Sequence, residues 1–297
     1  MKRFALYFFV AVLFLAVACS GPKKVTTPVV SDKELAEQAG LSGNYEKALE
    51  LWSLYFTKTP VEQVAGSDFA NAAGVAFKAG NTSQSVSWFD QARYKNFASA
   101  EMYLTLAEIY KEQKNISKEL TALEYLQTNY PEKSGIISRR LFEVYNEIKE
   151  PGKALNAWKN MNQTEQNDIQ LLNQYFELQK GLKDTLVCDS LANVLLDKDA
   201  KNVAALEWNA FKYYWKGENR YQREMEKYNS NKTNKQYKIL LEELDKSTAD
   251  FKKSLGYLDR LWNIEPGKKY ASYFANIYAR FGDEAKAKSY DKYLKNN

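Results

Sequence analysis

The fold is indicated most clearly by the stretch Gly43-Asn44-Tyr45-Glu46-Lys47-Ala48-Leu49, which is followed by Trp52 and then Pro60. Glycine followed by asparagine favours a tight turn. A helix that starts after this turn would end before Pro60, because proline disrupts a helix. Ala48 is a small residue at the position where a second helix would cross a first. Gly80-Asn81 and Gly282-Asp283 begin comparable segments. We therefore expect each of these segments to form the turn and second helix of a helical hairpin.

Turn markers recur along the chain at nearly constant intervals. They stand at positions 43, 80, 114, 149, 183 and 217, separated by 37, 34, 35, 34 and 34 residues. A single hairpin cannot bury its own apolar face, whereas stacked hairpins bury a continuous core. The pattern resembles the tetratricopeptide repeat (TPR), whose period is about 34 residues. The resemblance implies an all-α, TPR-like α-solenoid of about seven helical hairpins over residues 31–297.

The sixth unit departs from the period. Gly43 precedes Pro60 by 17 residues, but Gly217 precedes Pro266 by 49. The extra 32 residues, at about 218–250, have helical periodicity around a polar stretch. We expect a helical insertion that is either a solvated elaboration or a partner-specific arm, since insertions in such repeats fall on one side of the array.

The first nineteen residues have the features of an export signal. Lys2 and Arg3 precede an apolar run of 15 residues at 4–18, which is short for a membrane-spanning helix and typical of a secretory signal. The ending Ala16-Val17-Ala18-Cys19 resembles the bacterial lipobox, although Ala16 stands where leucine is more common. The resemblance implies cleavage after residue 18, lipidation of Cys19 and a tether at 19–30. A plain signal peptide that leaves Cys19 as a free thiol is the alternative.

Composition excludes several kinds of site. Among 297 residues there is no histidine, which removes Ser-His-Asp and Cys-His catalysis and histidine-ligated zinc. Cys188 occupies an alanine position, so we expect a buried, unreactive thiol. Residues 197–208 lack the glycine and glutamate of a calcium loop, and no phosphate loop is present. The net charge of +5 gives no argument for nucleic acid. We expect no enzyme activity, cofactor or metal.

One regularity points to a binding surface. A glutamate lies six residues before four of the turn markers, and residues at this phase line the concave groove in TPR proteins. The resemblance therefore implies a groove that is acidic at its front and aromatic at its rear, suited to a basic, partly apolar segment. Ordinary helix solubility is the alternative. The predicted groove residues are Glu37, Glu108, Glu143, Glu177, Phe211, Tyr214 and Trp215.

The chain is similar in overall character to TPR lipoproteins of Bacteroidetes-type bacteria. This resemblance implies a lipid-anchored scaffold or adaptor that binds envelope proteins or peptide segments, at the outer membrane or facing the periplasm, with the cell surface as an alternative. Other interpretations are a component of outer-membrane β-barrel assembly, a carboxylate-dependent envelope enzyme, or glycan capture by exposed aromatic residues. Asp184-Thr185-Leu186 and Asp189-Ser190-Leu191 resemble the O-glycosylation acceptor of exported Bacteroidetes proteins.

Overall fold

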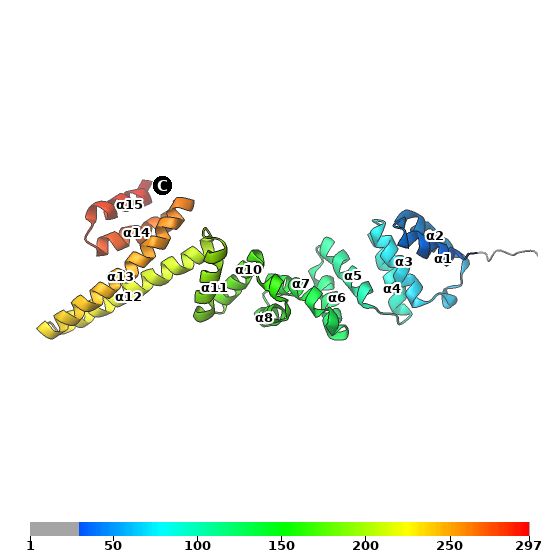
Figure 1. The fold of residues 1–297 in the computed structure, drawn as a ribbon, viewed down its shortest axis with the longest axis horizontal. Coiled ribbons are helices and arrows are strands. Elements are labelled where there is room, and N and C mark those ends of the chain that lie inside the picture. Colours follow the sequence, from blue (N-terminus) through cyan, green and yellow to red (C-terminus); the bar gives the residue numbers. More distant parts are fainter. Residues whose placement is uncertain (1–29, 297) are drawn as a thin grey trace, which may run out of the picture. The chain divides into compact units, whose positions relative to one another are not determined.

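A computed structural model describes residues 30–296, and every regular element in that range is a helix (Figure 1). The predicted signal peptide, Cys19 and nearly all of the tether lie outside the described residues. The chain divides into two compact units, one ending at Met102 and the other starting at Tyr103. Nothing in the repeat period marks this division. No helix within residues 30–296 is both long enough and apolar enough to cross a membrane.

The first unit contains two helical hairpins. Asp68, a buried carboxylate on the third helix, joins the two: it accepts hydrogen bonds from Lys33 Nζ at 2.6 Å and from the Tyr55 hydroxyl at 3.1 Å. Phe56 stacks on Phe69 with ring centroids 4.7 Å apart. The elements are α1 (Asp32–Leu41), α2 (Tyr45–Lys58), the 3-10 helix η1 (Val61–Gln63), α3 (Gly66–Lys78) and α4 (Thr82–Tyr94).

The second unit contains five further hairpins, so the described residues hold seven in all. The predicted fold class, all-α with about seven TPR-like hairpins, is confirmed. The elements are α5 (Ala100–Glu112), α6 (Ile116–Asn129), η2 (Pro131–Lys133), α7 (Ser134–Glu147), α8 (Pro151–Asn160), the single turn α9 (Gln163–Gln166), α10 (Ile169–Gly181), α11 (Thr185–Lys198), α12 (Val203–Ser230), α13 (Asn234–Ile264), α14 (Lys268–Arg280) and α15 (Glu284–Asn296).

Six hairpins share one turn geometry. In the first, Gly43 has φ +79°, its N–H donates to the Gly40 carbonyl, and the Asn44 N–H donates to the Ala39 carbonyl. This Schellman arrangement ends the first helix, and Asn44 then caps the second by accepting from the Lys47 N–H at 3.3 Å. A residue with a positive, left-handed φ occupies the same turn position in five further hairpins, at Gly80, Lys114, Lys149, Lys183 and Gly282. The predicted turn markers 43, 80, 114, 149 and 183 are thus confirmed.

The predicted turn at Gly217 is wrong. α12 continues through Gly217 to Ser230, and the turn lies at 231–233. The extra residues lengthen both helices of the sixth hairpin, to 28 and 31 residues against 13 and 14 in α5 and α6. Gly217 instead allows close helix packing, because a Cβ there would lie 3.1 Å from both the Phe251 ring and the Ser247 carbonyl oxygen. The insertion is therefore an elongated hairpin.

Small residues and aromatic stacking pack the hairpins, as the sequence predicts. Ala48, Ala154 and Cys188 are fully buried, and burial raises the pKa of the Cys188 thiol, as expected for an unreactive side chain. Between neighbouring hairpins, Trp158 stacks on Tyr175 with centroids 4.2 Å apart.

Buried ion pairs also join neighbouring hairpins of the second unit. Arg140 on α7 donates from Nε and a terminal nitrogen to the two carboxylate oxygens of Glu119 on α6, at 2.5 and 3.0 Å. Arg280 on α14 makes the corresponding two-pronged contact with Glu218 on α12. Each arginine fixes the register of one hairpin against another, because its planar fork matches a carboxylate in only one orientation.

Candidate binding surface

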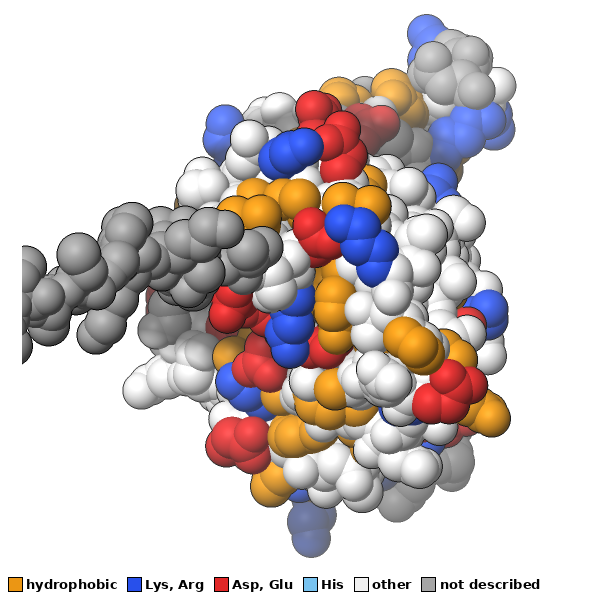
Figure 2. Space-filling model, turned by 90° about the vertical axis from the view of Figure 1, so that its right-hand side faces the viewer, with side chains coloured by type: hydrophobic (Ala, Val, Ile, Leu, Met, Phe, Trp, Pro, Cys, Tyr) orange, Lys and Arg blue, Asp and Glu red, His pale blue; other side chains and the backbone are white. Residues whose placement is uncertain are grey.

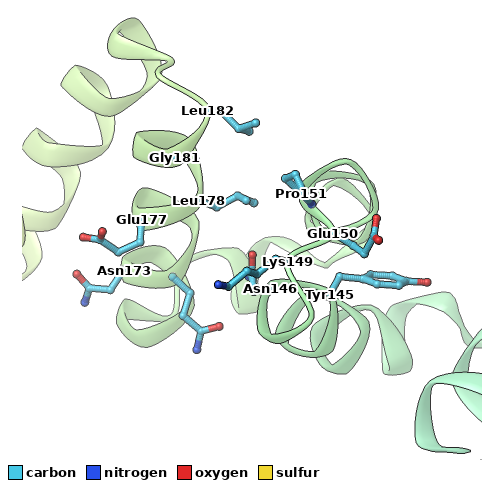
Figure 3. A pocket seen from close by; sticks show the side chains of 11 residues that line it. Tyr145, Asn146, Lys149, Glu150, Pro151, Asn173, Glu177, Leu178, Gly181 and Leu182 are labelled. Atoms are coloured by element: carbon cyan, nitrogen blue, oxygen red, sulfur yellow. The ribbon is translucent and has the colours of Figure 1, made fainter. Parts of the chain in front are cut away.

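Two cavities lie along the C-terminal half of α10 in the second unit. The first has a volume of about 610 Å³ and is lined by α7, by the turn after it and by α10. Leu178 of α10 and Leu182, directly after α10, point toward Pro151 at the start of α8 and give the cavity an apolar wall (Figure 3). The Glu177 side chain points away from these leucines, so its carboxylate belongs to the rim.

The second cavity, of about 460 Å³, is bounded by α10, α11 and α12. Its apolar lining comes from Trp208, Phe211 and Trp215, which follow one another at helical spacing on α12. Trp215 is 51% exposed, a high value for a tryptophan. The charged residues that line this second cavity are Lys180, Asp189, Glu207 and Lys212.

Asp189 organises the rim of the second cavity. It accepts hydrogen bonds from Trp208 Nε1 at 2.8 Å and from Lys212 Nζ at 2.9 Å. Burial alone would raise the pKa of Asp189, but the bonds from Lys212 and Trp208 lower it below its usual value. Asp189 is therefore a carboxylate at neutral pH, and it fixes the orientation of the Trp208 ring in the cavity wall.

An ion pair connects the two cavities. Lys180 Nζ lies 2.8 and 2.9 Å from the two carboxylate oxygens of Glu177. Glu177 lines the first cavity and Lys180 lines the second. The cavities are thus neighbours on one surface, separated by a pair of opposite charges rather than by a block of one sign.

The predicted acidic residues are less alike than their spacing suggests. Glu108 on α5 is exposed, whereas Glu143 on α7 is half-buried and accepts from Arg139 at 3.3 Å and Arg140 at 3.0 Å. Glu177 is paired with Lys180, as described above. Glu37 lies on α1 in the first unit and is half-buried. Among the described residues of the second unit, Glu143 and Glu177 are thus paired with neighbouring cations, and Glu108 is not. These three residues therefore do not form a continuous row of unpaired negative charges.

Two of the three predicted aromatic residues lie at a cavity. Phe211 and Trp215 line the second cavity, but the expectation that Tyr214 shares their surface is wrong. Tyr214 is 5% exposed and packs against Tyr273 and Phe251 at centroid distances of 4.6 and 5.9 Å. One residue step rotates a side chain about 100° around a helix, which turns Tyr214 from the cavity toward α13 and α14.

Trp208 is the aromatic residue of the second cavity that was not predicted from the sequence. The signal that could have found it is its spacing, three residues before Phe211 and seven before Trp215, which places all three on one helix face. Thr185 and Ser190, the hydroxyl residues of the two predicted glycosylation motifs, are exposed, and Thr185 lines the second cavity. Glycosylation there stays a prediction.

The arrangement is suited to holding apolar side chains between rim charges. Within residues 30–296, no group of three or more histidine, cysteine, aspartate or glutamate side chains is placed to hold a metal ion. Glu207, which lines the second cavity together with Asp189, accepts hydrogen bonds from Lys269 Nζ and from the Tyr270 hydroxyl, each at 2.6 Å. Both acids of that cavity are therefore engaged by internal donors.

Neither a protein-family model nor a curated protein sequence matches the chain. Among solved structures, the chain is similar to that of a proposed protein-binding protein from Bacteroides ovatus, with 18% identity, a TM-score of 0.50, and 74% of this chain and 100% of that chain covered. It is more loosely similar to a tetratricopeptide repeat protein from Parabacteroides merdae (12% identity, TM-score 0.45, 89% and 91% covered) and to the C-terminal part of a TPR repeat-containing protein from Cytophaga hutchinsonii (12%, 0.43, 88% and 93%). At this identity the first similarity supports the fold alone.

Proposed function

We propose that the chain is a scaffold or adaptor that binds a protein segment along the two cavities of the second unit. The observation that carries the proposal is the pair of adjacent apolar cavities separated by Glu177 and Lys180. Apolar side chains of the partner segment would bind in the cavities, where the exclusion of water from apolar surface favours binding. The charges at the rim would fix the position of that segment along the surface. The similar structure from Bacteroides ovatus bears the name of a proposed protein-binding protein, which agrees with this proposal.

Trp215 is the best single residue for testing this surface. Its side chain lines the second cavity and is half exposed, so its removal should leave the fold intact. Peptides selected from a random display library against the purified chain should bind Trp215→Ala about tenfold more weakly, the typical loss at an aromatic hot spot. Leu182→Ala tests the first cavity, and Leu54→Ala, at an equally exposed leucine of α2 in the first unit, is the control.

Two results would overturn the proposal. Peptides whose affinity is unchanged by both Trp215→Ala and Leu182→Ala bind elsewhere, and an equal loss in Leu54→Ala indicates a non-specific effect. Charge reversal at Glu108 tests the predicted acidic groove separately, since Glu108 is exposed. Reversal at Glu143 also removes the partner of Arg139 and Arg140, so it must be accompanied by a stability measurement.

We further propose that the chain is anchored to a bacterial membrane through lipidated Cys19 and works in the cell envelope. The support is the lipobox-like ending at residues 16–19. Metabolic labelling with an alkyne fatty acid should mark the wild-type chain and not Cys19→Ser, and cell fractionation should place the label in the outer membrane. Labelling of both chains, or of neither, would contradict the anchor. Crosslinking in native membranes would show whether a β-barrel assembly component or another envelope protein is the partner.

Glycan binding is the second candidate function. The specific observation in its favour is the presence of Trp208 and Trp215 beside polar groups in one open cavity, because an indole face packs well against a sugar ring. A sugar array probed with the wild-type chain and with Trp215→Ala tests this candidate. Sugar binding that disappears in the variant would favour it over peptide binding.

A further inference from the structure

The free end of the long hairpin has an unusual charge pattern. Between Glu226 and Glu242 there is no acidic residue, while lysines stand at 227, 232, 235 and 238. Lys227 pairs with Glu224 at 2.9 Å, but Lys232, Lys235 and Lys238 are exposed and form no ion pair within residues 30–296. By contrast, acidic and basic side chains are interspersed on the face drawn in Figure 2.

Apolar side chains are exposed at the same end. Tyr237, Ile239 and Leu241 are 47%, 39% and 46% exposed, and the Tyr237 ring lies 5.7 Å from that of Tyr228 across the turn. Figure 1 shows this end, where the ribbon is yellow, extending beyond α14 and α15. Lysines and apolar groups are therefore presented together where no other helix of the second unit covers them.

No acidic side chain among the described residues offsets the lysines at the start of α13. α13 begins at Asn234, and its first turn carries Lys235 and no acidic residue. The partial positive charge at the N-terminus of α13 is opposed by the partial negative charge at the C-terminus of α12, which ends at Ser230 on the other side of the turn. The net positive charge of this end therefore comes from its lysine side chains, including Lys235 and Lys238. An arrangement that is unfavourable within the chain becomes favourable when an anionic surface approaches it.

We propose that the end of the long hairpin, residues 227–241, binds the headgroup surface of an anionic phospholipid bilayer. Lysine ammonium groups would contact lipid phosphates, and Tyr237 and Leu241, which lie four residues apart on one face of α13, would enter the interfacial layer, as in other peripheral anchors. Each lysine near such a surface strengthens partitioning about fivefold, so the three unpaired lysines together contribute about a hundredfold. An acidic protein or a polyanion would use the lysines and leave these two apolar side chains in water.

The experiment follows lysine acetylation of the full chain by mass spectrometry, with excess vesicles of phosphatidylcholine alone or mixed with phosphatidylglycerol. In the anionic vesicles the acetylation rates of Lys232, Lys235 and Lys238 should fall about tenfold or more, and 0.5 M salt should restore them because screening removes the attraction. Lys159, Lys198 and Lys201, which are also exposed, serve as internal controls whose rates should not change.

Variants separate charge at this end from net charge. Reversal of Lys232, Lys235 and Lys238 to glutamate should abolish sedimentation that depends on anionic lipid, whereas the same reversal at Lys159, Lys198 and Lys201 should retain it. Equal acetylation in both kinds of vesicle overturns the proposal, as does protection by soluble poly-aspartate without protection by vesicles. Peptide binding at the cavities should be the same in all of these variants, so a failure here is distinguishable from a failure of the proposed scaffold function.

Discussion

The short hairpins between α5 and α11 and the long hairpin α12–α13 bury their helix faces in different ways. In the short hairpins, three residues with a left-handed residue in the middle connect one helix to the next, and each helix has 10 to 14 residues. In the long hairpin, the two helices pack mainly on each other: Ser247 Oγ donates to the Gly217 carbonyl at 2.7 Å and Ser254 Oγ to the Ala210 carbonyl at 2.8 Å.

A repeat of this kind can therefore be lengthened while its contacts with the neighbouring hairpins are kept. The added residues extend both helices outward from their crossing, and they form their own ion pairs, such as Arg220 with Glu243 at 2.9 Å. At the base of the long hairpin, α12 still contacts α14 through the ion pair between Glu218 and Arg280. Four substitutions test how differently the two kinds of hairpin are held together.

The largest effect is expected for Arg140→Met between two short hairpins. The Glu119 side chain is only 2% exposed, so removal of Arg140 leaves an unpaired buried charge at a cost of about 3–5 kcal/mol. Amide exchange should accelerate in α6 and α7, and chemical denaturation should give the total loss. Arg139→Met is the control, because Arg139 is 43% exposed and, among residues 30–296, pairs only with Glu143. An equal loss in both variants would contradict the assigned role of the buried pair.

Arg280→Met tests the corresponding pair at the base of the long hairpin. We expect a smaller loss, about 2 kcal/mol, because Glu218 is more exposed and keeps its hydrogen bond from Gln222. Burial alone would raise the pKa of Glu218, but the bonds from Arg280 and Gln222 lower it below its usual value.

This lowered pKa gives the second test a pH dependence with a definite sign. The Glu218 contribution is present above its unfolded-state pKa and is lost as the pH falls through the folded-state value. In the variant, the unpaired carboxyl is stabilised by protonation. The difference in unfolding free energy between wild type and variant should therefore shrink between about pH 7 and about pH 3. A difference that grows on acidification would refute the assignment.

Gly217→Leu tests the close packing within the long hairpin. The added side chain would overlap the Phe251 ring and the Ser247 backbone, which should lower the unfolding free energy by about 1–3 kcal/mol. Gly256→Leu in α13 is the matched control, because no atom lies within 4 Å of its added Cβ. That variant should gain about 0.5–1 kcal/mol from helix propensity. Similar results for both glycines would mean that crossing space is not the role of Gly217.

The smallest effect concerns the turns of the short hairpins. Lys149 has φ +60°, a left-handed conformation that costs a residue with a Cβ about 1 kcal/mol. Lys149→Gly should therefore stabilise the chain by about 0.5 kcal/mol after the entropy of glycine is subtracted. The reverse change, Gly43→Ala, should destabilise it by a similar amount, measured by thermal denaturation. A loss in Lys149→Gly would show that the turn depends on the lysine side chain.

The periodic part of the fold could be predicted because its signal is local. The turn at 114–115 is marked only by Lys114-Asn115, yet the period places it, and the structure gives Lys114 the same left-handed φ as Gly43. Gly217 fits the same period and misleads, because a glycine has two uses that spacing cannot distinguish. Only the position of Phe251, 34 residues later in the chain, makes Gly217 a packing residue.

The candidate site was predictable in part for the same reason. Phe211 and Trp215 follow from helical phase, whereas Tyr214 has the right type and region but faces Tyr273. For Glu143 and Glu177, spacing indicates a charge but not its partner. The cations that balance them lie three or four residues away on the same helices, and whether such side chains meet depends on their rotamers.

The helical hairpins, their number, all of their turns except the sixth and the small residues at their crossings could be predicted from the sequence, because turn chemistry and helical periodicity act over a few residues. Tertiary structure alone decided where the sixth hairpin turns, which aromatic side chain is buried, and that two cavities share the Glu177–Lys180 pair. Each of these depends on contacts between helices far apart in the chain, and such contacts leave no period in the sequence.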